Sequence, residues 1–224
     1  MRTLWRASLP TILDVYRAVL FDFGGVITTS PFDAFAEYER ELGIDVGTIR
    51  SINARSIDSN AWARLERGES DIPTFIEEFE QEAAQAGVEL DGARVLACLQ
   101  GQLRPRMVRA LERCSALFAT AIVTNNFHPP TADPESSPSA QAFAALAAVV
   151  DVVVESSRAG VRKPEPAFYE LALSRLGVSA HEAILLDDLG VNLKPARAMG
   201  MTTIKVVDPD EALEQLSALT GLDF

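Results

Sequence analysis

Residues 18–28 read Ala-Val-Leu-Phe-Asp-Phe-Gly-Gly-Val-Ile-Thr, a short apolar run that ends in the carboxylate of Asp22 and two glycines. An apolar run without alternation is typical of a strand that is covered on both faces. Glycines directly after a carboxylate let the backbone approach a ligand closely. Asp22 is therefore a candidate nucleophile or metal ligand at the end of a buried strand.

Four further apolar runs follow along the chain, and they also lack alternation. This pattern predicts strands of a parallel sheet with helices on both faces. Helical patterns separate the later runs, as in Pro166–Leu176, whose apolar stripe ends at Gly177. The sequence thus predicts a doubly wound, Rossmann-like α/β core with strands at Ala18–Phe23, Ala119–Thr124, Val149–Val154, Ala183–Leu186 and Thr202–Val207.

The first two predicted strands are separated by 95 residues rich in helix formers, far more than one crossover needs. Four segments there show helical spacing and are bounded by Gly, Pro, Ser or Asp, which predicts a small helical bundle. The expected helices are Phe32–Leu42, Ser59–Arg67, Pro73–Ala86 and Gly92–Leu99.

The expected layout has three parts: a leader of uncertain order at 1–17, an α/β core at 18–30 and 106–224, and a helical insertion at 31–105. Phe127–Ala140 contains four prolines and predicts an irregular loop. His128 lies in this loop, and we do not count it as catalytic, because a lone loop histidine more often has no catalytic role.

Composition limits the class of partner. Hydrophobic residues make up 48% and charged residues 23% of the 224 residues, which is typical of globular proteins. The formal net charge of −12 disfavours nucleic acid and anionic membranes as partners, because both attract basic surfaces. We also find no apolar run long enough for a membrane helix. Cys98 and Cys114 are predicted to be two buried helical thiols without a disulfide, which fits a reducing cytoplasm.

Polar motifs follow several of the predicted strands. In an open parallel sheet, ligands bind at the carboxyl ends of strands, near the point where the strand order reverses. We therefore expect one cleft to contain Asp22, Thr124 with Asn125, Lys163, and Asp187 with Asp188.

The order and surroundings of these motifs resemble the haloacid dehalogenase-like hydrolase superfamily over residues 18–208. Asp-Phe-Gly-Gly-Val at 22–26 and Leu-Asp-Asp-Leu-Gly-Val-Asn-Leu-Lys-Pro-Ala-Arg at 186–197 look most like phosphatases related to the amino-terminal domain of soluble epoxide hydrolase. The helical insertion resembles the cap domain of that family. This resemblance implies a Mg²⁺-dependent phosphatase that acts on a small phosphorylated metabolite.

The resemblance also implies a role for each motif. Asp22 is expected to attack phosphorus and form an aspartyl-phosphate. An aspartate nucleophile needs a cation to relieve its charge repulsion with phosphate. The expected Mg²⁺ ligands are Asp22, the carbonyl of Gly24 and Asp188, because Mg²⁺ prefers oxygen ligands. Asp187 and Asn192 are expected to support this metal site.

Lys163 is expected to touch both the nucleophile and the phosphate, where its positive charge offsets developing negative charge. Thr124 and Asn125 are expected to donate hydrogen bonds to phosphate oxygens. Arg162 is expected to be an ordinary surface residue.

One position departs from the family pattern. Most phosphatases of this superfamily carry a second aspartate two residues after the nucleophile as a general acid, and this chain has Gly24 there. Two alternatives therefore stay open: a non-catalytic member that binds a phosphorylated ligand or a partner, and, less favoured, a metal-independent 2-haloacid dehalogenase.

The sequence does not name the substrate or the oligomeric state, which is either a monomer or a homodimer. Phe32, Phe35 and Trp62 are candidates to line the cleft. For Trp62 we favour a place in the core of the helical insertion.

Overall fold

The computed structural model describes residues 15–126 and 138–224. It contains one sheet of five parallel strands in the order β3-β2-β1-β4-β5, which confirms the predicted α/β core. The strands are β1 (Ala18–Phe21), β2 (Ala119–Thr124), β3 (Val152–Glu155), β4 (Ala183–Asp187) and β5 (Thr202–Lys205). Strand β3 begins later than predicted because Val149 still donates a backbone hydrogen bond to Leu146, at the end of the preceding helix.

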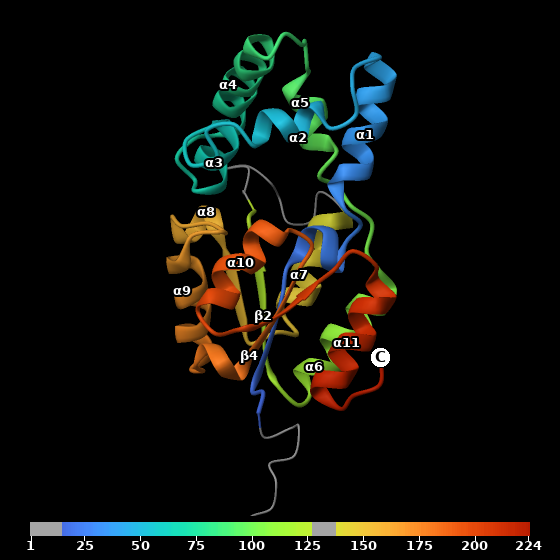
Figure 1. Cartoon of the computed structure of the whole chain (residues 1–224), viewed down its shortest axis with the longest axis vertical. Helices are drawn as coiled ribbons and strands as arrows, with labels where there is room; N and C mark the ends of the chain where they lie inside the picture. Colours follow the sequence, from blue (N-terminus) through green and yellow to red (C-terminus); the bar gives the residue numbers. More distant parts are fainter. Residues whose placement is uncertain (1–14, 127–137) are drawn as a thin grey trace, which may run out of the picture.

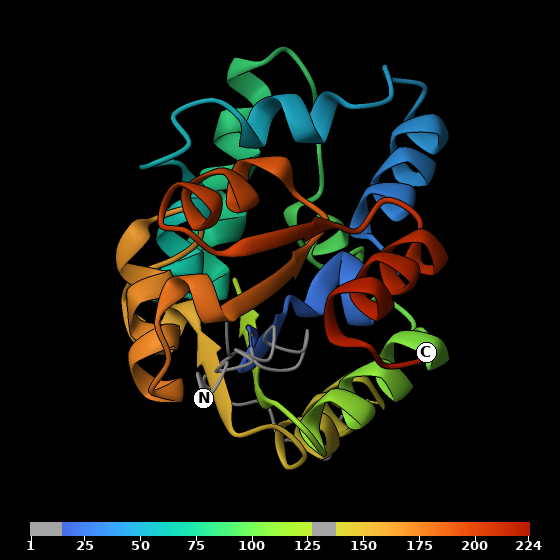
Figure 2. The same cartoon turned by 60° about the horizontal axis from the view of Figure 1, so that its bottom comes forward.

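Helices cover both faces of the sheet, as the apolar strands require (Figure 2). Alternate residues of β1 point to opposite faces, so Val19 and Phe21 belong to one apolar cluster and Ala18 and Leu20 to another. The first cluster includes residues of α6 (Pro105–Ser115), α7 (Pro138–Ala147) and α11 (Pro209–Thr220). The second includes residues of α9 (Pro166–Leu176) and α10 (Gly190–Ala198).

A group of five short helices lies over one end of the sheet (Figure 1). We call it the cap. Its core is aromatic: Trp62 is 7% exposed, and its ring centroid lies 4.7 Å from that of Phe75, which stacks on Phe79. Trp62 therefore lies in the cap core, as favoured above. The cap helices are α1 (Pro31–Leu42), α2 (Thr48–Asn53), α3 (Ala61–Glu66), α4 (Ile72–Gln85) and α5 (Gly92–Ala97).

Side-chain caps explain where most of these helices begin. Asn60, Asp71 and Asp91 each accept a hydrogen bond from the backbone N–H three residues later, which satisfies a free donor of the first turn. Helix α2 was not predicted. It is only six residues long, and its first turn is held by Glu39 of α1, a contact that local sequence does not reveal.

The remaining described elements are short: η2 (Phe23–Ile27), α8 (Ser156–Ala159) and η3 (Ala180–Glu182). Most of the predicted leader, together with residues 127–137 and His128, lies outside the described residues. Helix α7 begins at Pro138, inside the segment that was predicted to be an irregular loop. In the two described ranges, no helix is long and apolar enough to cross a membrane.

The two cysteines differ from the prediction in one respect. Cys114 is fully buried in α6, as expected, but Cys98 follows the last residue of α5 and is only half-buried. The expectation of two buried thiols is therefore correct for Cys114 and wrong for Cys98.

Candidate active site

The site lies at the carboxyl ends of the central strands, where the strand order reverses between β1 and β4. Asp22 directly follows β1, and its backbone N–H donates to the carbonyl of Leu186 in β4 at 2.9 Å. Asp187 is the last residue of β4, and Thr124 is the last residue of β2. The register of the sheet therefore brings these three side chains to one edge, as the sequence predicted.

Two glycines follow the nucleophile candidate, and their surroundings differ. Gly25 has a φ of +76°, and a Cβ there would lie 2.2 Å from Oδ2 of Asp188. Only glycine permits both this backbone conformation and the close approach of Asp188. Gly24 has a φ of −68°, which any residue can adopt, and a Cβ there would meet nothing within 4 Å. The missing side chain at Gly24 is therefore not imposed by steric crowding.

Lys163 is the cationic centre of the site. Its side chain is 1% exposed, and its Nζ lies 2.7 Å from Oδ2 of Asp22 and 2.7 Å from Oδ2 of Asp187. The long side chain thus bridges the carboxylates that end β1 and β4. The sequence predicted the contact with Asp22, and the structure adds the contact with Asp187.

The carboxylate charge of the site exceeds its positive charge. Burial raises the pKa of Asp22 well above its usual range; Lys163 opposes this shift, and Asp187 and Asp188 reinforce it. Burial also raises the pKa of Asp188 to about 6, with Asp187 as the next cause. Burial alone would lower the pKa of Lys163, but Asp187 and Asp22 outweigh it and raise the pKa. If all three aspartates are ionised, one lysine leaves two negative charges uncompensated.

The same three aspartates could hold a divalent cation. One carboxylate oxygen each from Asp22, Asp187 and Asp188 lie within 4.8 Å of one another. Mg²⁺ takes oxygen ligands, and its two positive charges would balance the two negative charges that Lys163 does not compensate. The donor set therefore fits Mg²⁺. The carbonyl of Gly24 stays a predicted ligand.

Asp187 is fully buried and held on several sides. Asn192 donates from Nδ2 to its two carboxylate oxygens at 3.0 and 3.1 Å, and the backbone N–H of Leu189 donates to Oδ1 at 2.8 Å. Tyr169 in turn donates its hydroxyl to the carbonyl of Asn192 at 2.7 Å. Asn192 of α10 thus lies at the site as predicted, and its amide reaches Asp187 at the end of β4.

The structure places Asn125 differently from the prediction. Its Nδ2 donates both to the carbonyl of Lys163 and to Oε2 of Glu66, each at 3.0 Å. An amide group has two hydrogens, so neither is left for a phosphate oxygen in this arrangement. The structure therefore shows Asn125 in contact with the backbone of Lys163, and its contact with phosphate stays a prediction. Thr124, 5% exposed, keeps its predicted place at the end of β2.

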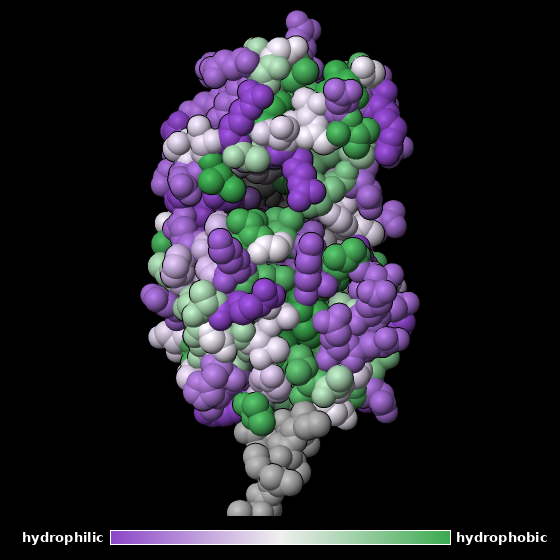
Figure 3. All heavy atoms as spheres, viewed as in Figure 1, coloured by the Kyte–Doolittle hydropathy of each residue, from purple (hydrophilic) through white to green (hydrophobic). Residues whose placement is uncertain are grey.

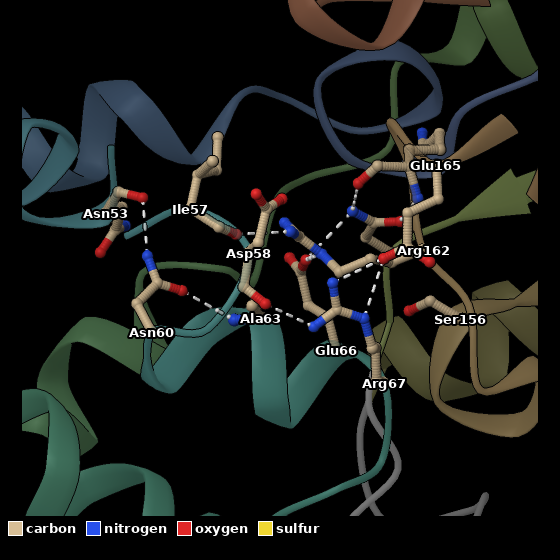
Figure 4. A network of polar contacts seen from close by, with 12 residues as sticks. Asn53, Ile57, Asp58, Asn60, Ala63, Glu66, Arg67, Ser156, Arg162 and Glu165 are labelled. Carbon is tan, nitrogen blue, oxygen red and sulfur yellow. Dashed lines mark hydrogen bonds and ion pairs between the residues drawn. The ribbon is translucent and has the colours of Figure 1, made fainter. Parts of the chain in front are cut away.

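The expectation that Arg162 is a surface residue is wrong. Arg162 is 9% exposed, and its Nε donates to Oε2 of Glu66 at 2.5 Å while its Nη1 donates to the carbonyl of Ile57 at 3.0 Å (Figure 4). Both partners belong to the cap. The cap buries this guanidinium against an opposite charge, a tertiary contact that the local sequence does not indicate.

Sequence reasoning missed two residues near the site. Glu66 ends α3 and is described above as a partner of Asn125 and Arg162. Arg104 lies between the cap and α6, and its Nη1 donates to the carbonyl of Gly25 at 2.7 Å. Its positive charge also opposes the raised pKa of Asp188. Neither residue belongs to a motif, because each reaches the site from a distant part of the chain.

The surface is hollowed where the cap meets the core (Figure 3). Three aspartates and a lysine lie together at the end of a doubly wound sheet, beneath a helical cap. This arrangement is typical of capped α/β enzymes with a carboxylate-rich site. Residues 16–200 match the haloacid dehalogenase-like hydrolase family. The chain therefore belongs to that family, as the resemblance implied.

Three curated relatives are similar over most of this chain. Mouse acyl-CoA dehydrogenase family member 10 is 38% identical over 92% of this chain, and pig bifunctional epoxide hydrolase 2 is 31% identical over 93%. The chain spans only 19% and 39% of their lengths. The sesquiterpene phosphatase astK of Aspergillus oryzae is 28% identical over 92% of this chain and 97% of its own length.

A solved structure shows the same fold. The HAD-hydrolase YfnB of Bacillus subtilis, bound to magnesium, has a TM-score of 0.62 and 19% sequence identity, and the match covers 93% of this chain and all of YfnB. At this identity the likeness concerns the fold.

Proposed function

We propose that this protein is a Mg²⁺-dependent phosphatase that hydrolyses a small phosphate monoester. The observation that carries the proposal is the meeting of Asp22, Lys163, Asp187 and Asp188 at one edge of the sheet. Two further findings support it: a relative of matching length is a phosphatase, and YfnB, which shares the fold, was solved with magnesium. A cytoplasmic location fits the free thiols and stays part of the proposal.

Asp22 is the proposed nucleophile. Its carboxylate oxygen attacks phosphorus, the bond from phosphorus to the alcohol oxygen breaks, and an aspartyl-phosphate forms on Asp22. Water then attacks this phosphorus, which releases inorganic phosphate and restores the carboxylate. Lys163 lies 2.7 Å from Oδ2 of Asp22, where its charge can offset the negative charge that develops on the phosphoryl oxygens. Thr124 is proposed to donate its hydroxyl to one of these oxygens.

The residues proposed to hold Mg²⁺ are Asp22, Asp188 and the carbonyl of Gly24, with Asp187 in support. A bound Mg²⁺ supplies neutralisation of the phosphate oxygens. Gly24 provides no acid, so the leaving alcohol must take its proton from another source. We therefore expect faster hydrolysis of aryl phosphates, whose leaving groups are acidic, than of alkyl phosphates.

The test is the hydrolysis of p-nitrophenyl phosphate by the full chain with Mg²⁺, next to the Asp22→Asn variant. We expect the substitution to lower turnover by on the order of 10⁴-fold, because it removes the nucleophile. An asparagine retains an oxygen that can accept from the N–H of Phe23, as Asp22 does now, so the variant should stay folded. Equal activity of the two proteins would contradict the proposal.

A second candidate function is binding of a phosphorylated ligand without turnover, and Gly24 is the observation that favours it. Calorimetry with inorganic phosphate and Mg²⁺ separates the two. Measurable binding together with no hydrolysis of any aryl or alkyl phosphate would favour the binding function.

A metal-independent dehalogenase is disfavoured, because the three clustered aspartates fit a cation; release of chloride from a 2-chloro acid without metal would revive it.

A further inference from the structure

The cap touches the segment that carries Lys163. Glu66, the last residue of cap helix α3, accepts hydrogen bonds on one carboxylate oxygen, Oε2, from two residues of the core. Arg162 donates from Nε at 2.5 Å and Asn125 donates from Nδ2 at 3.0 Å. The Glu66 and Arg162 side chains are 15% and 10% exposed, and Figure 4 shows them facing each other between cap and core. This pair is therefore well shielded from solvent.

Asn125 in turn forms hydrogen bonds with the backbone of Lys163. Its Oδ1 accepts from the backbone N–H of Lys163 at 2.9 Å, and its Nδ2 donates to the carbonyl of Lys163 at 3.0 Å. One amide group thus holds both backbone polar groups of the residue whose Nζ contacts Asp22 and Asp187. Two anchored backbone groups fix the direction in which the side chain leaves the chain.

Glu66 adds a third contact that holds the amide of Asn125 in place. A carboxylate accepts hydrogen bonds only, so it must face the NH₂ end of the amide and not the carbonyl oxygen. With Nδ2 facing Glu66, Oδ1 faces the N–H of Lys163, as observed. Glu66 thus favours the same orientation as the backbone of Lys163, and without it the amide loses its hydrogen bond to the cap. Burial raises the pKa of Glu66, and Arg162 opposes that shift.

We infer that Glu66 of the cap is a positioning residue for Lys163, acting through Asn125, so that the charge at Asp22 is correctly placed only when the cap is docked on the core. The inference rests on the proposed function for its catalytic consequence, whereas its structural consequence stands alone. It gives the cap a second role besides covering the cleft: the cap completes the support of a core residue.

Arg67 offers a matched control, because it forms a second ion pair between cap and core. Its Nη2 lies 2.6 Å from Oε1 of Glu165, and its side chain is 15% exposed, as is that of Glu66. This pair attaches the cap without a hydrogen bond to Asn125. If Glu66 merely attaches the cap, Glu66→Ala and Arg67→Ala should have similar effects.

The experiment compares the steady-state kinetics of Glu66→Ala, Glu66→Gln and Arg67→Ala on p-nitrophenyl phosphate with Mg²⁺. We expect Glu66→Ala to lower kcat by about 10- to 100-fold, because a displacement near 1 Å at a catalytic group has that effect, while KM changes by less than about threefold. Arg67→Ala should change kcat by less than about threefold. Glu66→Gln should retain most of the wild-type kcat, since the single amide oxygen of glutamine can accept both hydrogen bonds that Oε2 of Glu66 accepts now.

A crystal structure of Glu66→Ala decides the inference even if the wild-type protein hydrolyses no phosphate ester. We expect the Asn125 side chain to shift and Nζ of Lys163 to move by more than about 1 Å from its contact with Asp22. An unchanged Asn125 and Lys163 would overturn the inference. So would equal losses of kcat in Glu66→Ala and Arg67→Ala. An inactive wild type together with a displaced Lys163 would overturn the proposed function alone.

Discussion

Cap and core each bury a carboxylate completely, but they satisfy it in different ways. Glu39 of the cap is 1% exposed and accepts from the backbone N–H groups of Gly47 and Ile49, each at 2.7 Å. Asp187 of the core is fully buried and shares the lysine ammonium with Asp22. A carboxylate that accepts backbone donors orders a chain turn, whereas carboxylates that crowd around one cation leave charge for a ligand.

The difference shows what marks a site in this fold. Burial of a charge by itself does not, because Glu39 is as buried as Asp187. The mark is the imbalance of charge: three aspartates meet one lysine in the core, while the N–H groups of a helix start satisfy Glu39. Substitutions can therefore separate the two regions, because the cap carboxylate should affect stability and the core cluster should affect both stability and chemistry.

The largest effect is expected from Lys163→Met. The variant removes the ammonium from two buried carboxylates, those of Asp22 and Asp187, and breaking a buried ion pair in this way costs about 3–5 kcal/mol of unfolding free energy. Loss of the positive charge at the phosphate should also lower turnover by about 10²- to 10³-fold. Urea unfolding and aryl phosphate kinetics measure the two effects. Mg²⁺ should stabilise the variant more than the wild type, because the ion would then balance more charge.

Lys194→Met is the control for that substitution. Lys194 is exposed on α10, so its loss should change stability by less than about 0.5 kcal/mol. If Lys163→Met were as stable and as active as this control, the ammonium would have no structural or catalytic importance, and the contrast between cap and core would fail.

The next effect is a gain, from Gly24→Asp. The position has an ordinary φ of −68° and open space around a Cβ, so an aspartate can be introduced there without backbone strain. If a missing general acid limits the reaction, hydrolysis of an alkyl phosphate should rise by about 10²-fold, and that of an aryl phosphate should rise less. Gly24→Ala adds the Cβ without the acid and should leave both rates unchanged. A rise with alanine as well would show that proton donation is not the cause.

A smaller effect, on stability alone, is expected from Glu39→Gln in the cap. Glutamine offers one acceptor oxygen in place of two, so one charge-assisted hydrogen bond to a buried backbone N–H is lost, at about 1.5–3 kcal/mol. The kcat for p-nitrophenyl phosphate at 25 °C should change by less than about twofold, because the site keeps all its side chains. Glu41→Gln, which breaks the exposed ion pair with Arg94, should cost at most about 1 kcal/mol. A loss of kcat in Glu39→Gln would show that the cap carboxylate also acts on the site.

The smallest effect concerns the two thiols, whose reactivity measures how accessible α6 of the core and the end of cap helix α5 are to a reagent. Burial raises the pKa of Cys114 in the core to about 12, and Cys98 at the end of α5 is half-buried. The thiolate is the reactive form, so iodoacetamide at pH 8 should alkylate Cys98 at least about tenfold faster than Cys114. Mass spectrometry of the native protein measures the ratio. Equal rates would mean that Cys114 in α6 becomes exposed as readily as Cys98 at the end of α5.

The fold was largely predictable from the chain, because its signals are local. Apolar runs without alternation, such as the one before Asp22, identify strands that are buried on both faces, and a parallel sheet then fixes where their carboxyl ends meet. The positions of Asp22, Thr124 and Asp187 follow from this. Helix α2 escaped prediction because Glu39, from another helix, supplies the contacts of its first turn.

What the sequence determined by itself, then, is the set of strands and the residues that end them, because strand burial and turn chemistry are local properties. Only the tertiary structure decided the partners of those residues. Arg162 has a partner because Glu66 of the cap, 96 positions away in the chain, covers it, and the same carboxylate accepts a hydrogen bond from Asn125, which holds the backbone of Lys163. Contacts between distant segments depend on how the cap packs on the core, and no local pattern encodes that packing.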